Sequence, residues 1–181
     1  MNHWSIDTSW CLFLDRDGVI NTRKFGGYIE HVDEFEFING SDIAIAELSQ
    51  LFQHTLVVTN QQGIGKGIMT EGNLSEIHRY MCAKIEELGG KIDCCYFAPD
   101  LASPENQLRK PNTGMGIAAK RDFPTVNFQK SVMVGDSDSD IEFGTRLGMK
   151  TVRILYNEEP KIEADLTLGS LAEFKKWILG K

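Results

Sequence analysis

Two aspartates, one residue apart, stand where an apolar run of the chain ends. Asp15 and Asp17 follow the run CLFL at residues 11–14, and Gly18 comes directly after them. Two carboxylates about 5 Å apart would repel each other by roughly 3 kcal/mol at an effective dielectric constant near 20. A bound divalent cation would compensate this repulsion. The alternative is that Asp17 and Gly18 only form a tight turn, because Asp-Gly is a strong turn signal.

Polar and charged side chains also follow the other strand-like runs. The run at 55–59 ends in Thr59-Asn60-Gln61, and the run at 131–134 is followed by Gly135 and an acidic segment at 136–140. Ligands bind at the carboxyl ends of the strands in open parallel sheets, so these side chains should meet at one edge. That convergence favours the cation site over the turn. The candidates are Asp15, Asp17, Thr59, Asn60, Arg109, Lys110, Asp136 and Asp140.

Short β-branched runs alternate with segments of helical periodicity along the whole chain. This alternation predicts an α/β fold, a doubly wound, mostly parallel, Rossmann-like sheet with helices on both faces, in a single domain over residues 1–181. We expect strands at 11–14, 55–59, 92–97, 131–134 and 150–155, and helices at 42–52, 70–88, 114–121, 138–147 and 171–179. Thr70 can cap the second helix, in which apolar residues recur at spacings of three and four.

Composition limits the classes of partner. The net charge of −7 over 181 residues argues against nucleic-acid binding, which needs a basic stripe, but it permits a small anionic substrate. No apolar stretch approaches the roughly 20 residues of a membrane span, and the N-terminus lacks a secretory signal pattern. The four cysteines form no metal-binding or disulfide pattern. We therefore expect a cytoplasmic, monomeric protein with a small-molecule substrate.

Two known ligand-binding motifs, the calcium-binding loop and the phosphate-binding P-loop, are only partly matched by this sequence. The acidic segment at 136–140 imitates a calcium loop, but the sixth position is Ile141 where glycine is needed, and the twelfth is Leu147 where glutamate is needed. The Gly-rich segment at 63–67 lacks the serine or threonine that a P-loop requires after its lysine. A helix N-terminus explains Asp138 and Asp140, although it does not explain Asp136.

Taken together, the strand-end motifs resemble those of the haloacid-dehalogenase superfamily of aspartate-nucleophile phosphatases. Its four signatures appear in order as DRDGVIN, VVTNQ, RKP and GDSDSD. Within the superfamily, residues 12–153 resemble the heptose-1,7-bisphosphate 7-phosphatases and, more loosely, the histidinol-phosphate phosphatases. The likeness extends to the flanking sequences GYIEHVDEFEFING, TNQQGIGKG and RKPNTGMG.

The resemblance implies a role for each candidate residue. Asp15 would be the nucleophile that forms an aspartyl-phosphate, and Asp17 the general acid and then the base, a role that needs a raised pKa. Mg²⁺ would be held by the Asp15 side chain, the Asp17 main-chain carbonyl and the Asp136 side chain. Asp140 would not bind the ion itself but would lie in the shell of residues around these ligands. The phosphate would be contacted by Thr59, Asn60, Lys110 and Arg109.

The chain departs from the family in the segment before Arg109. Those families usually carry a zinc loop, CxH followed by CxC, whereas this chain has Ala98 and Asp100, and then Gln107 and Leu108, at the corresponding places. Cys94 and Cys95 lie too early to substitute. We therefore predict no zinc. The spacing between motifs leaves no room for a cap domain, so a capless, open site is expected.

The leading hypothesis is a magnesium-dependent phosphatase that removes the 7-phosphate of a heptose 1,7-bisphosphate. A histidinol-phosphate phosphatase is the nearest alternative, and it would leave Arg109 and Lys66 without a second phosphate to bind. A phospho-accepting receiver-like signalling module also uses an acidic cluster and a lysine, but it has no need of Asp17. A catalytically silent sugar-phosphate binder is a further alternative.

Overall fold

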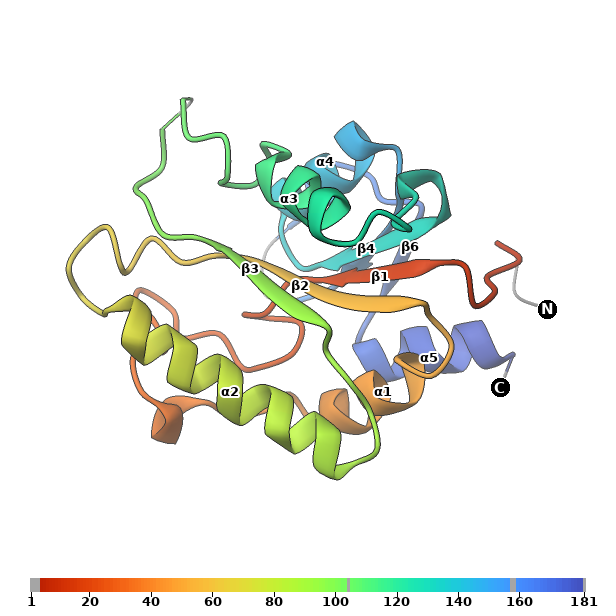
Figure 1. Ribbon diagram of the computed structural model, residues 1–181, viewed down its shortest axis with the longest axis horizontal. Coiled ribbons are helices and arrows are strands. Elements are labelled where there is room, and N and C mark those ends of the chain that lie inside the picture. Colours follow the sequence, from red (N-terminus) through yellow and green to blue (C-terminus); the bar gives the residue numbers. More distant parts are fainter. Residues whose placement is uncertain (1–3, 104, 157–158, 181) are drawn as a thin grey trace.

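The computed structural model describes residues 4–103, 105–156 and 159–180 and contains a parallel sheet of six strands in the order β3-β2-β1-β4-β5-β6 (Figure 1). From β1, the strands β2 and β3 follow in order on one side of the sheet, and β4, β5 and β6 follow in order on the other. The topological switch point therefore lies between β1 and β4. The strands are β1 Cys11–Leu14, β2 His54–Asn60, β3 Cys94–Ala98, β4 Ser131–Gly135, β5 Lys150–Ile154 and β6 Leu166–Leu168.

Helices cover both faces of the sheet. Figure 1 shows α1, α2 and α5 on one face and α3 and α4 on the other. This arrangement confirms the predicted doubly wound α/β fold. The helices are α1 Ser41–Leu48, α2 Glu71–Glu87, α3 Gly114–Asp122, α4 Asp138–Leu147 and α5 Leu171–Leu179, with short 3-10 helices at Val32–Glu34 and Phe128–Lys130.

The central strand β1 is buried on both faces, as parallel strands usually are. Leu12 and Leu14 pack into the core under α1, α2 and α5, whereas Cys11 and Phe13 pack into the core under α3 and α4. All four side chains are completely inaccessible to solvent. This double burial holds the carboxyl end of β1, from which Asp15 follows, in a fixed place.

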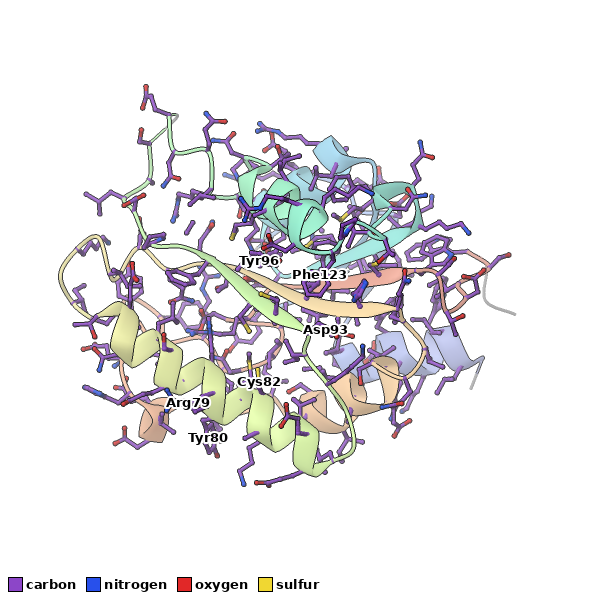
Figure 2. All side chains as sticks on the ribbon, viewed as in Figure 1. Arg79, Tyr80, Cys82, Asp93, Tyr96 and Phe123 are labelled. Atoms are coloured by element: carbon purple, nitrogen blue, oxygen red, sulfur yellow. The ribbon has the colours of Figure 1, made fainter. Side chains whose placement is uncertain are left out.

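The same division is visible at the edge strand β3. Tyr96 and Phe123 lie on the α3 side of the sheet, and Tyr80 and Cys82 lie on the α2 side (Figure 2). The cysteines are free thiols, one buried and three half-buried. None of the helices in the described ranges is long and apolar enough to cross a membrane.

Most predicted elements match the structure to within one or two residues. The predicted cap of α2 is confirmed, because Thr70 Oγ1 accepts the Asn73 N–H at 3.1 Å and Asn73 Oδ1 accepts the Thr70 N–H at 2.9 Å. Helix α1 ends at Leu48 and not at residue 52, since the following residues turn to place Phe52 in the core. The strand β6 was not predicted, because three residues are too short to show a pattern.

The connections between the early strands leave no cap domain within the described residues. Only a 3-10 helix and α1 lie between β1 and β2, and only α2 lies between β2 and β3. In the described ranges these connections therefore contain no set of elements that could form a cap domain, as the motif spacing predicts.

A buried imidazole lies in the core under α2. His78 is 9% exposed, and its Nε2 atom lies 3.5 Å from Nη1 of Arg16, which is fully buried. Burial and the neighbouring guanidinium charge lower the pKa of His78 to about 3. The imidazole is therefore neutral in the folded protein at ordinary pH.

We expect His78 to make the protein less stable in mild acid. The unfolded chain takes up a proton on His78 near pH 6.5, but the folded protein does so only near pH 3, so stability falls as pH drops through this window. Between pH 6.5 and 5 the loss is about 2 kcal/mol. Urea unfolding of wild type and His78→Gln at pH 7 and pH 5 measures it, with the exposed His31→Gln as control. An equal pH dependence in all three proteins would contradict the expectation.

Candidate active site

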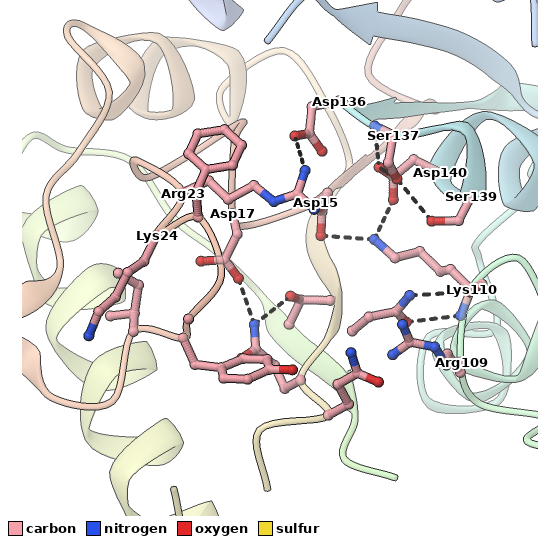
Figure 3. Close-up of a pocket in the computed structure, with 18 of the residues that line it drawn as sticks. Asp15, Asp17, Arg23, Lys24, Arg109, Lys110, Asp136, Ser137, Ser139 and Asp140 are labelled. Carbon is pink, nitrogen blue, oxygen red and sulfur yellow. Dashed lines mark hydrogen bonds and ion pairs between the residues drawn. The ribbon is translucent and has the colours of Figure 1, made fainter. Parts of the chain in front are cut away.

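The carboxyl ends of β1, β2 and β4 open into one cavity of about 440 Å³ (Figure 3). All eight sequence candidates line it, as the strand-end argument predicts. Four aspartates and five cationic side chains face this space. They are Asp15, Asp17, Asp136 and Asp140, and Arg23, Lys24, Lys66, Arg109 and Lys110.

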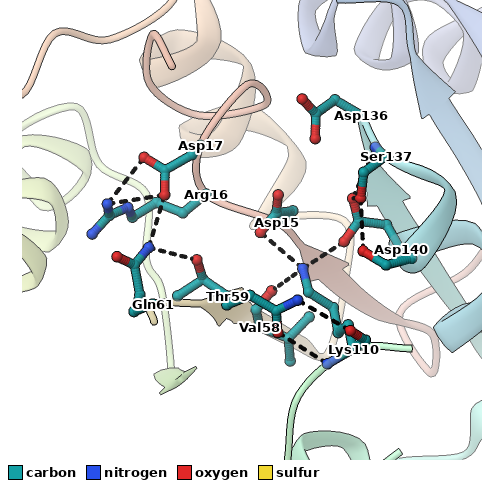
Figure 4. Close-up of polar contacts among 12 residues, drawn as sticks. Asp15, Arg16, Asp17, Val58, Thr59, Gln61, Lys110, Asp136, Ser137 and Asp140 are labelled. Carbon is teal, nitrogen blue, oxygen red and sulfur yellow. Dashed lines mark hydrogen bonds and ion pairs between the residues drawn. The ribbon is translucent and has the colours of Figure 1, made fainter. Parts of the chain in front are cut away.

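A buried ammonium group joins the acidic residues at the cavity floor. Lys110 Nζ donates to Asp15 Oδ1 at 2.8 Å, to Asp140 Oδ1 at 2.5 Å and to the Val58 carbonyl at 2.7 Å (Figure 4). Burial lowers the pKa of Lys110, but the charges of Asp140 and Asp15 outweigh this effect and raise it above its ordinary value. Lys110 is therefore a permanent cation beside Asp15.

Asn60 positions the main chain of Lys110. Its Oδ1 accepts the Lys110 N–H at 2.9 Å, and its Nδ2 donates to the Lys110 carbonyl at 3.2 Å. The side chain predicted to bind phosphate thus uses its carbonyl and one amide N–H within the protein. One N–H of the Asn60 amide remains for a ligand in the cavity.

Three carboxylates come together near the ends of β1 and β4. Asp15, Asp136 and Asp140 each offer an oxygen within 4.8 Å of the other two. Asp140 already has partners on both oxygens, because its Oδ2 accepts the Ser137 N–H at 3.0 Å and its Oδ1 accepts from Lys110. This is the supporting position that the resemblance implies for Asp140.

Asp15 and Asp136 are less well compensated. Burial raises the pKa of Asp15 to about 6, with Lys110 acting in the opposite direction. Burial, followed by the charges of Asp15 and Asp140, raises the pKa of Asp136 to about 8. Its neighbouring cation is Arg23, whose Nη1 lies 3.4 Å from Asp136 Oδ2. The pair is a site of excess negative charge that a divalent cation would stabilise.

Gly18 lets the chain pass directly over Asp136. Its φ is +91°, and a Cβ atom at this position would collide with the Asp136 carboxylate. The glycine after the two aspartates is therefore needed both for its backbone conformation and for its small size. The turn that the sequence presents as an alternative to a cation site is present, and it lies directly against the Asp136 carboxylate.

Asp17 has a different environment from the one expected. Burial raises its pKa, but the Arg16 charge and hydrogen bonds from Asn21, Arg16 and Gln61 outweigh burial, so the pKa lies below its usual value. Arg16 Nη2 lies 3.0 Å from both Asp17 oxygens, and Gln61 Nε2 donates to Oδ2 at 2.7 Å. The expected raised pKa of Asp17 is therefore wrong for the ligand-free protein.

Sequence reasoning did not identify Arg16, Arg23 and Gln61 as site residues. Gln61 also donates to Thr59 Oγ1 at 2.9 Å, so it links two of the predicted residues. Its place directly after β2 could have marked it. Arg16 carried no such signal, because an arginine that is fully buried is rare.

Arg109 also lines the cavity. Its Nη1 atom is buried and has no hydrogen-bond partner within the described residues. Lys66 lines the same cavity, with its Nζ atom 5.4 Å from the centroid of the Tyr28 ring. These two cations can receive an anionic group in addition to the one beside Lys110.

The donor set suits Mg²⁺, a hard cation that takes carboxylate oxygens. By contrast, the described residues of the segment 99–109 contain neither cysteine nor histidine, and Cys94 and Cys95 lie on β3. Within the described ranges, Asp15, Asp136 and Asp140 form the one group of at least three such ligands. The segment before Lys110 therefore does not fit a zinc site.

Comparisons with known proteins agree with this geometry. The HAD-hydrolase-like family model matches residues 107–170. The D-glycero-alpha-D-manno-heptose-1,7-bisphosphate 7-phosphatase of Mycobacterium tuberculosis H37Rv is 38% identical over 133 residues, 74% of this chain and 70% of the relative. The D-glycero-beta-D-manno-heptose-1,7-bisphosphate 7-phosphatase of Escherichia coli K12 is 32% identical over 182 residues and covers 92% of both chains.

A solved structure supports the same assignment. The D,D-heptose 1,7-bisphosphate phosphatase from B. bronchiseptica, complexed with magnesium and phosphate, has a TM-score of 0.84 and 25% identity, and it covers 94% of this chain and 98% of its own. Identity, coverage and fold together show that this chain belongs to the haloacid-dehalogenase-like phosphatases, in the family of the heptose-1,7-bisphosphate 7-phosphatases.

Proposed function

We propose that this protein is a Mg²⁺-dependent phosphatase that removes the 7-phosphate of a heptose 1,7-bisphosphate through an aspartyl-phosphate on Asp15. The observation that carries the proposal is the contact between Asp15 and Lys110 at the floor of a cavity whose wall holds further cations. A nucleophile, a charge partner for the transferring group and a place for a second phosphate are thus present in one space.

Asp15 starts the reaction by attacking the phosphorus atom of the 7-phosphate. Its carboxylate is largely ionised at pH 7, because its pKa is about 6. Lys110 Nζ neutralises part of the charge on the phosphoryl oxygens, and the Thr59 hydroxyl and one N–H of Asn60 donate to them. The P–O bond to the sugar breaks as the bond to Asp15 forms, so an acyl phosphate results.

Asp17 handles the proton in both steps. It gives a proton to the departing sugar oxygen and then takes one from the water that cleaves the acyl phosphate. The pKa of Asp17 is low in the free protein, and a phosphate dianion beside it raises that pKa through repulsion of like charges. Arg16 and Gln61 hold the carboxylate in place for both transfers.

Asp15, Asp136 and the main-chain carbonyl of Asp17 would hold Mg²⁺. When bound, the ion would supply positive charge that offsets the repulsion between the Asp15 carboxylate and the phosphate. Asp140 keeps Lys110 and the start of α4 in place through its bonds to Lys110 and Ser137.

The cationic wall favours a substrate with two phosphates. Arg109 and Lys66 add two positive charges to the cavity besides Lys110, and Arg109 Nη1 has no protein partner in the described residues. Histidinol phosphate would leave both charges unused and would bring its own ammonium group towards them. The geometry therefore supports the bisphosphate over the alternative substrate.

Replacing Asp15 by asparagine should abolish phosphate release. An amide has no negative charge to attack with, so the turnover number should fall by roughly 10³-fold or more with Mg²⁺ present. Phosphate release from heptose 1,7-bisphosphate, together with circular dichroism to confirm folding, measures the effect. Substantial turnover by a folded Asp15→Asn protein would refute the nucleophile assignment.

Mg²⁺ should stabilise the folded protein. Binding to the native state alone adds about 2.7 kcal/mol at a free Mg²⁺ concentration 100 times Kd, which raises Tm by roughly 5–10 °C. Asp136→Asn should lose most of this increase, whereas the exposed Asp33→Asn, with the same change in charge, should retain it. Equal increases in Asp136→Asn and wild type would show that Mg²⁺ binds elsewhere.

The two substrates should differ clearly when compared side by side. We expect kcat/KM for heptose 1,7-bisphosphate to exceed that for histidinol phosphate by at least about 100-fold, which corresponds to about two charge-assisted contacts. Arg109→Ala should reduce this ratio mainly by raising KM for the bisphosphate. A preference for histidinol phosphate would overturn the substrate assignment.

A further inference from the structure

The segment between β3 and Arg109 has no metal ligand set in its described residues, and hydrogen bonds connect its parts. It leaves β3 at Ala98, includes the described residues 99–103 and 105–108, and leads to Arg109 and Lys110, which line the cavity. The Gly65 N–H donates to the Pro99 carbonyl at 2.9 Å near the start of this segment. The described residues of the segment form neither a strand nor a helix.

The Asn106 side chain connects parts of this segment by hydrogen bonds. Its Oδ1 accepts the main-chain N–H groups of Leu108 at 3.2 Å and Arg109 at 3.1 Å. Its Nδ2 donates to the Leu101 carbonyl at 3.3 Å. One half-buried amide side chain therefore bonds to both the beginning and the end of the segment.

Asn112 holds the segment from the other side of Arg109. Its Nδ2 donates to the Asn106 carbonyl at 2.9 Å, and its N–H donates to the Arg109 carbonyl at 2.8 Å. Arg146 of α4 donates to Asn112 Oδ1 at 2.9 Å, which connects the arrangement to the exposed side of α4. We call Asn106 and Asn112 the asparagine clasp.

We propose that the asparagine clasp positions Arg109 and that its hydrogen bonds hold this segment in place without a structural metal ion. Asn106 Oδ1 accepts the Arg109 N–H and the main-chain N–H of Asn112 donates to the Arg109 carbonyl, whereas the Asn60 side chain bonds both the N–H and the carbonyl of Lys110. Two adjacent residues are thus positioned by separate asparagines. The clasp sets the place of the Arg109 charge, and Asn60 sets the place of the charge at the reacting phosphate.

The kinetic consequence rests on the proposed function. If Arg109 binds the phosphate that is not cleaved, loss of the clasp weakens substrate binding and leaves the chemical step intact. Asn106→Ala should raise KM for the bisphosphate about tenfold and change kcat by less than about twofold, because three hydrogen bonds within the segment are lost. Asn106→Asp, which retains the acceptor oxygen, should keep most of the wild-type KM.

The decisive experiment is amide hydrogen exchange, which does not depend on the substrate. In Asn106→Ala, exchange at Leu108 and Arg109 should be at least about tenfold faster than in wild type. It should be nearly unchanged in Asn106→Asp and in Gln107→Ala, an exposed neighbour in the same segment. The purified protein should contain no stoichiometric zinc, and a zinc chelator should leave these exchange rates unchanged.

A double-mutant cycle connects the clasp to Arg109. Asn106→Ala should add little to the KM defect of Arg109→Ala, since the clasp acts through that side chain. Additive defects, unchanged exchange in Asn106→Ala, or stoichiometric zinc would each overturn the proposal. If the protein does not hydrolyse the bisphosphate at all, the proposed function fails, and the exchange rates and metal content still decide the structural claim.

Discussion

One buried ammonium group determines how the acidic edge of the sheet is assembled. Lys110 Nζ bonds Asp15, Asp140 and the Val58 carbonyl, so it joins the ends of β1 and β2 to the first turn of α4. Loss of one member of such a buried group leaves the other charges uncompensated, which typically costs about 3–5 kcal/mol. Catalytic geometry and local stability therefore depend on the same side chain.

The four aspartates differ in the protein groups that already satisfy them. Asp17 is held by Arg16 and Gln61, and Asp140 is held by Lys110 and Ser137 (Figure 4). Asp15 and Asp136 have fewer partners, and their pKa values rise accordingly. Neighbouring residues thus give the four aspartates different electrostatic environments. Asp15 and Asp136, which have the fewest hydrogen-bond partners, face the space where a cation and a phosphate would bind.

Local patterns were sufficient to predict the elements but not the contacts made by side chains. Helices α4 and α5 begin and end at the predicted residues, because helical periodicity acts within a few residues. The strand-end rule placed the candidates at one edge. It could not show that Asn60 bonds Lys110, 50 residues away, or that Gln61 bonds Asp17, 44 residues away. Such pairings arise only when distant segments pack together.

The separate support of Arg109 and Lys110 has a physical advantage. A single rigid support for both residues would transmit any change in the outer segment to the reacting phosphate, where small displacements are costly. Asn60 belongs to β2 and bonds Lys110 directly, so the position of Lys110 is tied to the sheet. Asn106 belongs to the exposed segment and bonds Arg109. We infer that a change in the outer segment would shift Arg109 and leave Lys110 in place.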